Sequence, residues 1–297
     1  MTLVGGSVGV SQLLVEAPLF TSQAIRYAVA GVILMGMLPL VGARLVRPRG
    51  LEWMWLAGVA ATGLVLFNVA VVRGVAHAEP ASIAVAVACV PVLLGVVGPL
   101  LERRSPHRRV VLAALVVTAG SLLVIGTGRT DAVGVGWAAV ALACEAGFTL
   151  LAVPVLPRHS AWGVSVHSVW MGAAMFLVLG VATEGPRAAW DLGVSDLAAV
   201  AYLAVLVTAV AFVLWYSSVA MLGAGPAGLL AGIAPISAAV TGMVLAGGVP
   251  GIAVWAGMAV VAVGLVVGLT RRVGPVRRPA RVAASTPPQH PETAVAV

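Results

Sequence analysis

The sequence predicts an all-α membrane protein of ten transmembrane helices, built as two inverted five-helix repeats. Three observations predict this fold: a composition that suits lipid, long uncharged windows between charged residues, and a second half that repeats part of the first. Of the 297 residues, 61% are hydrophobic and 9% are charged, and the mean hydropathy is +1.09. So few charges cannot coat a soluble globule of this size, whereas a bilayer requires almost none.

The first half contains four uncharged windows of transmembrane length. A helix needs about 20 apolar residues to cross about 30 Å of hydrocarbon. These windows cover residues 27–43, 53–72, 80–101 and 110–128. Residues 3–20 are predicted to form the first helix, although a cleavable signal peptide or a start annotated too late are alternatives for this stretch.

The second half supplies five more windows. Residues 132–157 are interrupted only by Glu145, and residues 160–183 only by His167. Residues 197–270 then contain no charge and no histidine over 74 positions. That length is too long for two helices and suits three, with Gly/Pro-rich breaks at 223–226 and 247–251.

An internal repeat relates the two halves. Pro91, Gly98, Leu101, Pro106, Val116, Val117 and Gly120 recur 144 positions later as Pro235, Gly242, Leu245, Pro250, Val260, Val261 and Gly264. We therefore expect one repeat over residues 1–127 and a second over 128–270. Residues 271–297 are rich in Pro, Arg and Ala, which predicts a disordered cytoplasmic tail near anionic lipid.

Arginine placement predicts the orientation, since the chain contains no lysine. Thirteen of the 17 arginines fall in loops after even-numbered helices or in the tail. They are Arg44, Arg47, Arg49, Arg103, Arg104, Arg108, Arg109, Arg158, Arg271, Arg272, Arg277, Arg278 and Arg281. The positive-inside rule then puts both termini in the cytoplasm of a cell membrane. Because each repeat has an odd number of spans, the two repeats are inverted.

The same features exclude several functional classes. A sequence pI near 10.9 would suggest a nucleic-acid partner in a soluble chain, but here the arginines mark helix ends. Cys89 and Cys144 both lie in apolar windows, so they predict neither a disulfide nor a metal site. No glycine-rich phosphate loop is present. We expect no cofactor, metal or nucleic acid, and contacts only with a small-molecule substrate, membrane lipid and, in a homodimer, a second copy.

The chain resembles a known family of carriers. Ten spans in two inverted repeats, Arg26 at the expected start of helix two, and prolines within helices four and nine are similar to EamA-type members of the drug/metabolite transporter superfamily. The most specific stretch runs from Pro91 to Gly120, where Leu100-Leu101-Glu102-Arg103 replaces the usual Gly-Glu ending of helix four. The resemblance implies export or exchange of small metabolites, amino acids or drugs, and it names no substrate.

Pro91 and Pro235 are the first candidates for lining a substrate site. A proline inside a helix removes a backbone donor and leaves a carbonyl four residues back unpaired, which is tolerated beside a cavity. Equivalent breaks in two inverted helices point to a central binding site. The alternative is that both prolines only kink their helices for packing.

Polar and aromatic residues inside the windows are the other candidates. Glu145 lies near the middle of helix six, where a carboxylate costs about 2.5 to 3.5 kcal/mol on insertion scales, so it should face the bundle interior. It is the candidate for proton coupling or for binding a cationic group, or else it only packs. His167 could relay protons, but a hydrogen-bonded helix contact is favoured. Asn68 could face the cavity, and Trp215 and Tyr216 could offer rings to a ligand or anchor the interface.

These observations predict a secondary transporter that moves a small organic solute by alternating access, with proton coupling through Glu145 as one route. The rival from another class is an integral membrane enzyme, which lacks a clustered catalytic set because Glu145 and His167 stand apart in sequence. A non-transporting membrane scaffold is the third hypothesis, and no soluble sensor domain supports it. We therefore expect a carrier and not an enzyme.

Overall fold

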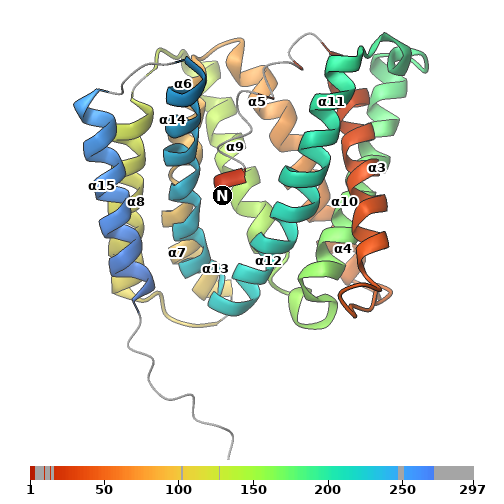
Figure 1. The fold of residues 1–297 in the computed structure, drawn as a ribbon. Helices are drawn as coiled ribbons and strands as arrows, with labels where there is room; N and C mark the ends of the chain where they lie inside the picture. The colour runs from red at the N-terminus through yellow and green to blue at the C-terminus, as the bar shows by residue number, and fades with distance from the viewer. Residues whose placement is uncertain are drawn as a thin grey trace, which may run out of the picture.

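The computed structural model describes residues 1–3, 10, 14, 17–101, 103–126, 128–246 and 251–270. Over these residues the chain is a bundle of helices that run roughly parallel to one another (Figure 1). The described part contains nine helical segments long and apolar enough to cross a membrane. Most of the expected first helix and the whole 271–297 tail lie outside the described residues.

The spans of the first half are, in chain order, α3 (Leu19–Met37), then α4 (Glu52–Val59), π-helix η2 (Ala60–Leu66) and α5 (Phe67–Val75) as one span, α6 (Pro80–Val87) and α7 (Val90–Leu101) as the next, and α8 (Arg108–Ile125). The window 80–101 was therefore predicted with its observed ends. The windows 53–72 and 110–128 each shift by a few residues.

The spans of the second half are α9 (Ala132–Leu150), α10 (Leu156–Thr183), then α11 (Val194–Tyr202), π-helix η4 (Leu203–Val210) and α12 (Ala211–Leu222) as one span, α13 (Ala224–Leu229), 3-10 helix η5 (Leu230–Gly232) and α14 (Ile233–Ala246) as the next, and α15 (Ile252–Leu269). A short 3-10 helix η3 (Ala188–Asp191) precedes α11. The apolar 197–270 window thus holds three spans, as predicted. The first break is at Gly223, whose φ of +85° favours glycine. Most of the second predicted break, residues 247–250, lies outside the described residues.

Helix two differs from its predicted window. The window 27–43 is bounded by Arg26 and Arg44, but the helix covers Leu19–Met37, so Arg26 lies inside α3 instead of at its start. The reason is a distant cap: the Glu184 carboxylate accepts hydrogen bonds from the backbone amides of Phe20 and Thr21, at 2.7 and 2.8 Å. Those amides would otherwise be unpaired at a helix start.

The irregular segments of the two halves also correspond. α8 and α15 both span 18 residues and begin 144 positions apart, at Arg108 and Ile252. The π-helices η2 and η4 begin at Ala60 and Leu203, 143 positions apart, each in the middle of its span. The break between α6 and α7 likewise corresponds to η5. The repeat therefore extends from sequence to the shape of the backbone.

The packing of α8 against α15 shows the pseudo-twofold relation directly. The two helices lie side by side at one edge of the bundle (Figure 1). A Cβ added at Gly120 would lie 2.7 Å from the Val261 amide nitrogen, and one added at Gly264 would lie 3.1 Å from the Val117 amide nitrogen. Gly120 and Gly264 are repeat partners, and so are Val117 and Val261. Each half thus presents the same contact to the other.

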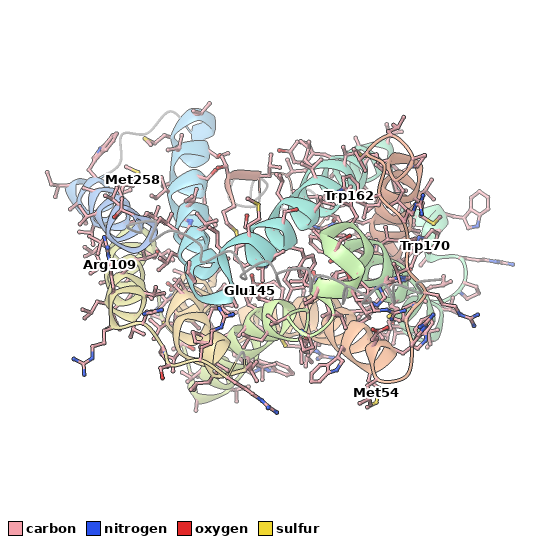
Figure 2. The ribbon with its side chains drawn as sticks, turned by 90° about the horizontal axis from the view of Figure 1, so that it is seen from below. Met54, Arg109, Glu145, Trp162, Trp170 and Met258 are labelled. Carbon is pink, nitrogen blue, oxygen red and sulfur yellow. The ribbon has the colours of Figure 1, made fainter. Side chains whose placement is uncertain are left out.

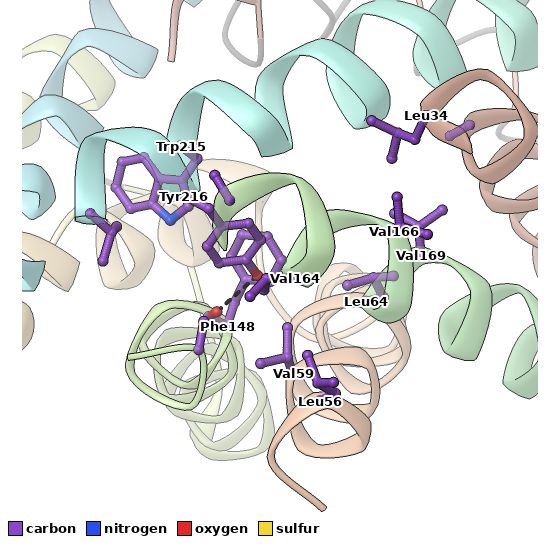
Figure 3. Packing of buried hydrophobic residues seen from close by; sticks show 14 of the residues in the cluster. Leu34, Leu56, Val59, Leu64, Phe148, Val164, Val166, Val169, Trp215 and Tyr216 are labelled. Atoms are coloured by element: carbon purple, nitrogen blue, oxygen red, sulfur yellow. Dashed lines mark hydrogen bonds between the residues drawn. The ribbon is translucent and has the colours of Figure 1, made fainter. Parts of the chain in front are cut away.

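The largest buried cluster lies at the opposite side of the bundle, where α3 packs along α10 and η4, and α10 also packs against α4 and η2. Tyr27 stacks on Phe176 with ring centroids 5.5 Å apart. Phe148, Trp215 and Tyr216 form its aromatic end (Figure 3). This cluster supports one wall of the cavity described next.

Candidate functional site

A cavity of about 170 Å³ lies between the two halves. The first half contributes α3, η2 and α5 to its wall, and the second half contributes α9, η4 and α12. Gly63 and Val207, from the two π-helices, sit near the midpoints of their spans, so the cavity is at middle depth. Its lining residues are Met1, Arg26, Tyr27, Gly63, Phe67, Asn68, Glu145, Phe148, Val207, Ala211, Phe212 and Trp215.

Glu145 is the acidic residue of this wall. It is on α9, toward the middle of the bundle when the molecule is viewed from below (Figure 2). Within the described part of the chain its carboxylate accepts no hydrogen bond and forms no ion pair. A partly exposed carboxylate on a cavity wall can receive a proton or a cationic group from a ligand.

Arg26 lines the same cavity, and the sequence analysis missed it. Its Nε donates to Thr208 Oγ1 of η4 at 2.9 Å, and its Nη1 donates to Gln23 Oε1 at 3.2 Å. Its guanidinium carbon also lies 5.2 Å from the Tyr27 ring centroid. Gln23 and Thr208 are buried, so the guanidinium is held in place from two helices. Gln23 and Arg26, three residues apart on one helix face, were the signal that could have revealed it.

Asn68 lines the cavity, but part of its side chain is already used. Its Nδ2 donates to the Leu64 carbonyl inside η2 at 2.6 Å. Its Oδ1 accepts no hydrogen bond from the residues that the structure describes. Asn68 therefore presents an acceptor to the cavity while supporting the irregular backbone of η2.

Trp215 and Tyr216 take different positions. Trp215 lines the cavity, and its Nε1 donates to Thr149 Oγ1 at 3.0 Å. Tyr216 is fully buried behind the wall, and its hydroxyl donates to the Phe148 carbonyl at 3.1 Å (Figure 3). Phe148 in turn meets Phe212 edge to face, with ring centroids 4.9 Å apart. The rings of this wall are thus fixed before any ligand arrives.

Pro91, Pro235 and His167 are not among the residues that line the cavity. Pro91 follows the break between α6 and α7, where Thr118 Oγ1 donates to the Ala88 carbonyl at 3.1 Å. His167 Nε2 donates to the Val46 carbonyl at 2.9 Å, in the loop between α3 and α4. The sequence favoured a hydrogen-bonded helix contact for His167, but its partner here is a loop carbonyl.

Comparisons with known proteins identify the family of this chain. The sequence matches the EamA-like transporter family over residues 2–126 and 132–270. The chain belongs to this family. It is therefore a multi-pass membrane transporter of small molecules.

Two curated relatives and one solved structure extend the comparison. An uncharacterized transporter, YetK, of Bacillus subtilis (strain 168) is 28% identical over 254 residues, covering 82% of this chain and 77% of its own. A probable terminal-alkyne amino-acid exporter of Streptantibioticus cattleyicolor is 28% identical over 230 residues, covering 76% and 75%. A crystal structure that is 19% identical superposes with a TM-score of 0.73 over 90% of this chain and 94% of its own, which shows the fold alone.

Charged groups of this EamA-like transporter also gather at both ends of the bundle. At one end, Glu52 accepts hydrogen bonds from Arg158 and from His159 Nε2, which joins the start of α4 to the start of α10. At the other end, Arg129 pairs with Glu79 at 2.9 Å and His77 pairs with Asp131 at 3.1 Å. Hydrogen bonds from the Gly134 amide and from His77 lower the pKa of Asp131.

A larger cavity, of about 680 Å³, opens between the ends of α7, α10, α12 and α13. It is lined by Arg104, Ser105, His107 and apolar groups, contains no acidic residue, and includes none of the candidate residues from the sequence. Among the described residues no group of three or more His, Cys, Asp or Glu could hold a metal ion. The smaller cavity at middle depth is therefore the candidate site of this transporter.

Proposed function

We propose that this chain is a secondary carrier that exports or exchanges a small organic metabolite, amino acid or drug by alternating access of its two halves, residues 1–127 and 128–270. The observation that carries the proposal is the cavity at middle depth, whose wall comes from both halves and combines Glu145, Arg26 and Asn68 with aromatic rings. A solute held between two inverted repeats can leave to either side when the repeats move against each other. The Streptantibioticus relative, named as a probable amino-acid exporter, supports the outward direction.

Reconstituted transport tests this proposal. Proteoliposomes containing the purified protein should accumulate at least one member of a panel of amino acids and organic cations, and protein-free liposomes should not. Preloading the same solute inside should accelerate uptake if the carrier exchanges. A panel that gives no uptake in either mode, with protein shown to be folded by its melting curve, would argue against a carrier.

Glu145 is the proposed site of proton coupling, because it is the acidic side chain on the cavity wall and has no partner in the described structure. Glu145→Gln keeps the size of the side chain but cannot change its charge. Uptake driven by a pH gradient in inverted vesicles should therefore fall by about tenfold or more. Full gradient-driven uptake by the Gln variant would assign Glu145 to packing alone.

We also propose that both termini are cytoplasmic in a cell membrane, from the distribution of arginine. In a variant with Cys89 and Cys144 replaced by Ala, a single cysteine beside Gly185 should react with an impermeant thiol reagent on intact cells. A cysteine in the 103–109 loop should not react until the membrane is opened. The reverse labelling pattern would invert the topology.

A further inference from the structure

Two opposite charges face one cavity from different halves of the molecule. Arg26 is on α3 and Glu145 is on α9, and both side chains line the same space of about 170 Å³. The described residues contain no ion pair between them. Each charge is therefore available to a ligand instead of being neutralised by the other.

The guanidinium of Arg26 is prepared for an anion. Of its five N–H donors, one on Nε is directed to Thr208 and one on Nη1 to Gln23. The described structure shows no acceptor for the remaining three. A planar guanidinium with a fixed orientation, and with donors that the described residues do not use, matches a carboxylate, which can accept two parallel hydrogen bonds from it.

Glu145 is suited to bind a cationic group. When ionised, its carboxylate only accepts hydrogen bonds, and the described structure gives it no donor. An ammonium group brings three donors and a compensating charge. Because one carboxylate accepts either a proton or an ammonium group, binding of the two is mutually exclusive, which is consistent with proton coupling at the same residue.

We infer that the cavity binds a zwitterion, an α-amino acid with an apolar side chain, whose carboxylate contacts Arg26 and whose ammonium group contacts Glu145. This inference rests on the carrier function proposed above. The remaining wall is mainly apolar and aromatic, with Phe67, Phe148 and Phe212 among its residues. The volume is below the roughly 300 to 1,000 Å³ of sites for drug-sized ligands, so the solute is small.

Solutes with a single charge should be rejected. An amine without a carboxylate leaves the donors of Arg26 that face the cavity without a ligand partner, and an acid without an ammonium group leaves Glu145 without one. A site built to hydrogen-bond a group discriminates strongly against the analogue that lacks it, since its own polar groups lose their partner. Recognition of both ends therefore sets the specificity.

Binding to the purified protein in nanodiscs tests the inference with three probes of the same carbon skeleton: leucine, 3-methylbutylamine and 4-methylpentanoate. Leucine should raise the melting temperature and bind at least about tenfold more tightly than either analogue. Equal affinity for the amine or the acid would overturn the zwitterion assignment.

Variants of Arg26 and Glu145 test which residue binds the carboxylate and which binds the ammonium group of leucine. Arg26→Gln should weaken leucine binding about tenfold or more while leaving the weak binding of 3-methylbutylamine unchanged, and Arg26→Lys should restore part of the loss. Glu145→Gln should weaken leucine but not 4-methylpentanoate. Retained binding of the analogues shows that each variant is folded. Arg73→Gln and Glu79→Gln, at exposed positions away from the cavity, are matched controls and should bind leucine normally.

Exchange transport separates this inference from the proposed function. If Glu145 holds the ammonium group, Glu145→Gln should lose leucine exchange without a gradient as well as gradient-driven uptake. If exchange survives and only coupling is lost, the carrier proposal stands and the ammonium contact is wrong. If leucine binds as expected but no solute is transported, the site assignment stands and the carrier proposal fails.

Discussion

The α8–α15 pair and the cavity wall use the same repeat in opposite ways. In the pair, Gly120 and Gly264 bring two regular helices into backbone contact, and Arg109 adds hydrogen bonds to Val267 and Thr270 at one end. At the cavity, two corresponding spans carry the π-helices η2 and η4, and two opposite charges, Arg26 on α3 and Glu145 on α9, come from neighbouring helices. The last helix of each repeat therefore joins the halves at one edge, while the spans with the π-helices leave space between the halves in the middle.

The π-helices account for the space between the halves. A π-helix bonds each amide to the fifth preceding carbonyl and packs less tightly than an α-helix, and such segments occur often at functional sites. η2 contributes Gly63 to the cavity wall and η4 contributes Val207. η4 also contributes Thr208, which holds Arg26. Irregular backbone at this depth is tolerated where it lines a cavity.

The largest effect should come from a substitution in the contact between α8 and α15. Gly120→Val would place side-chain carbons against the backbone of Val261 and Gly257, which cannot move aside. Overpacking of this kind costs about 1 to 3 kcal/mol and sometimes more, so the yield of monodisperse protein and its melting temperature should fall sharply. Gly136→Val, with open space around its Cα, is the control and should behave as the native protein. Equal stability of the two variants would contradict the close contact.

A smaller effect, on transport and not on stability, should come from a deletion in the π-helix η4. Deleting Val205, a lipid-exposed residue of η4, would let the segment become an α-helix while the flanking helices keep their register. The melting temperature should be unchanged or higher, and transport should fall about tenfold, because Thr208 and Arg26 lose their arrangement.

Deleting exposed Val263 from the regular helix α15 is the matched control for that experiment. It should rotate the following turn by about 100°, since 3.6 residues make one turn. Gly264 would then leave its contact with Val117, and folding should suffer. Transport that survives deletion of Val205 would show that η4 only fills space.

The sequence predicted the helices better than the site, for a physical reason. Apolar windows between charges locate spans, because most charges avoid lipid. Arg26 was assigned to a helix end by that rule, yet Gln23 and Thr208 satisfy it inside the protein. Thr208 is 182 residues away, so no local pattern could reveal the pairing.

Deep polar residues were the part of the site that the sequence could predict. Glu145 and Asn68 reach the cavity because a polar group at that depth avoids lipid, and Trp215 joins them. His167 obeys the same rule but meets the loop carbonyl of Val46, since a connecting segment can pack against a helix. The π-helices had no sequence signal, because their residues are as apolar as those of the α-helices beside them.

The smallest effect should come from the ion pair of Glu79 and Arg129 at one end of the bundle, which contrasts with the two charges of the cavity. Arg129 is 94% exposed, so water already solvates it and screens the pair. Arg129 lowers the pKa of Glu79, so any stabilisation is present above the unfolded pKa of Glu79 and is lost as pH falls through its folded pKa. Glu79→Gln should thus change the melting temperature barely at pH 7 and not at all at pH 3, with transport intact. A large loss of transport at neutral pH would instead show that this pair takes part in transport, and the functional charges would then extend from the cavity to the loops at this end of the bundle.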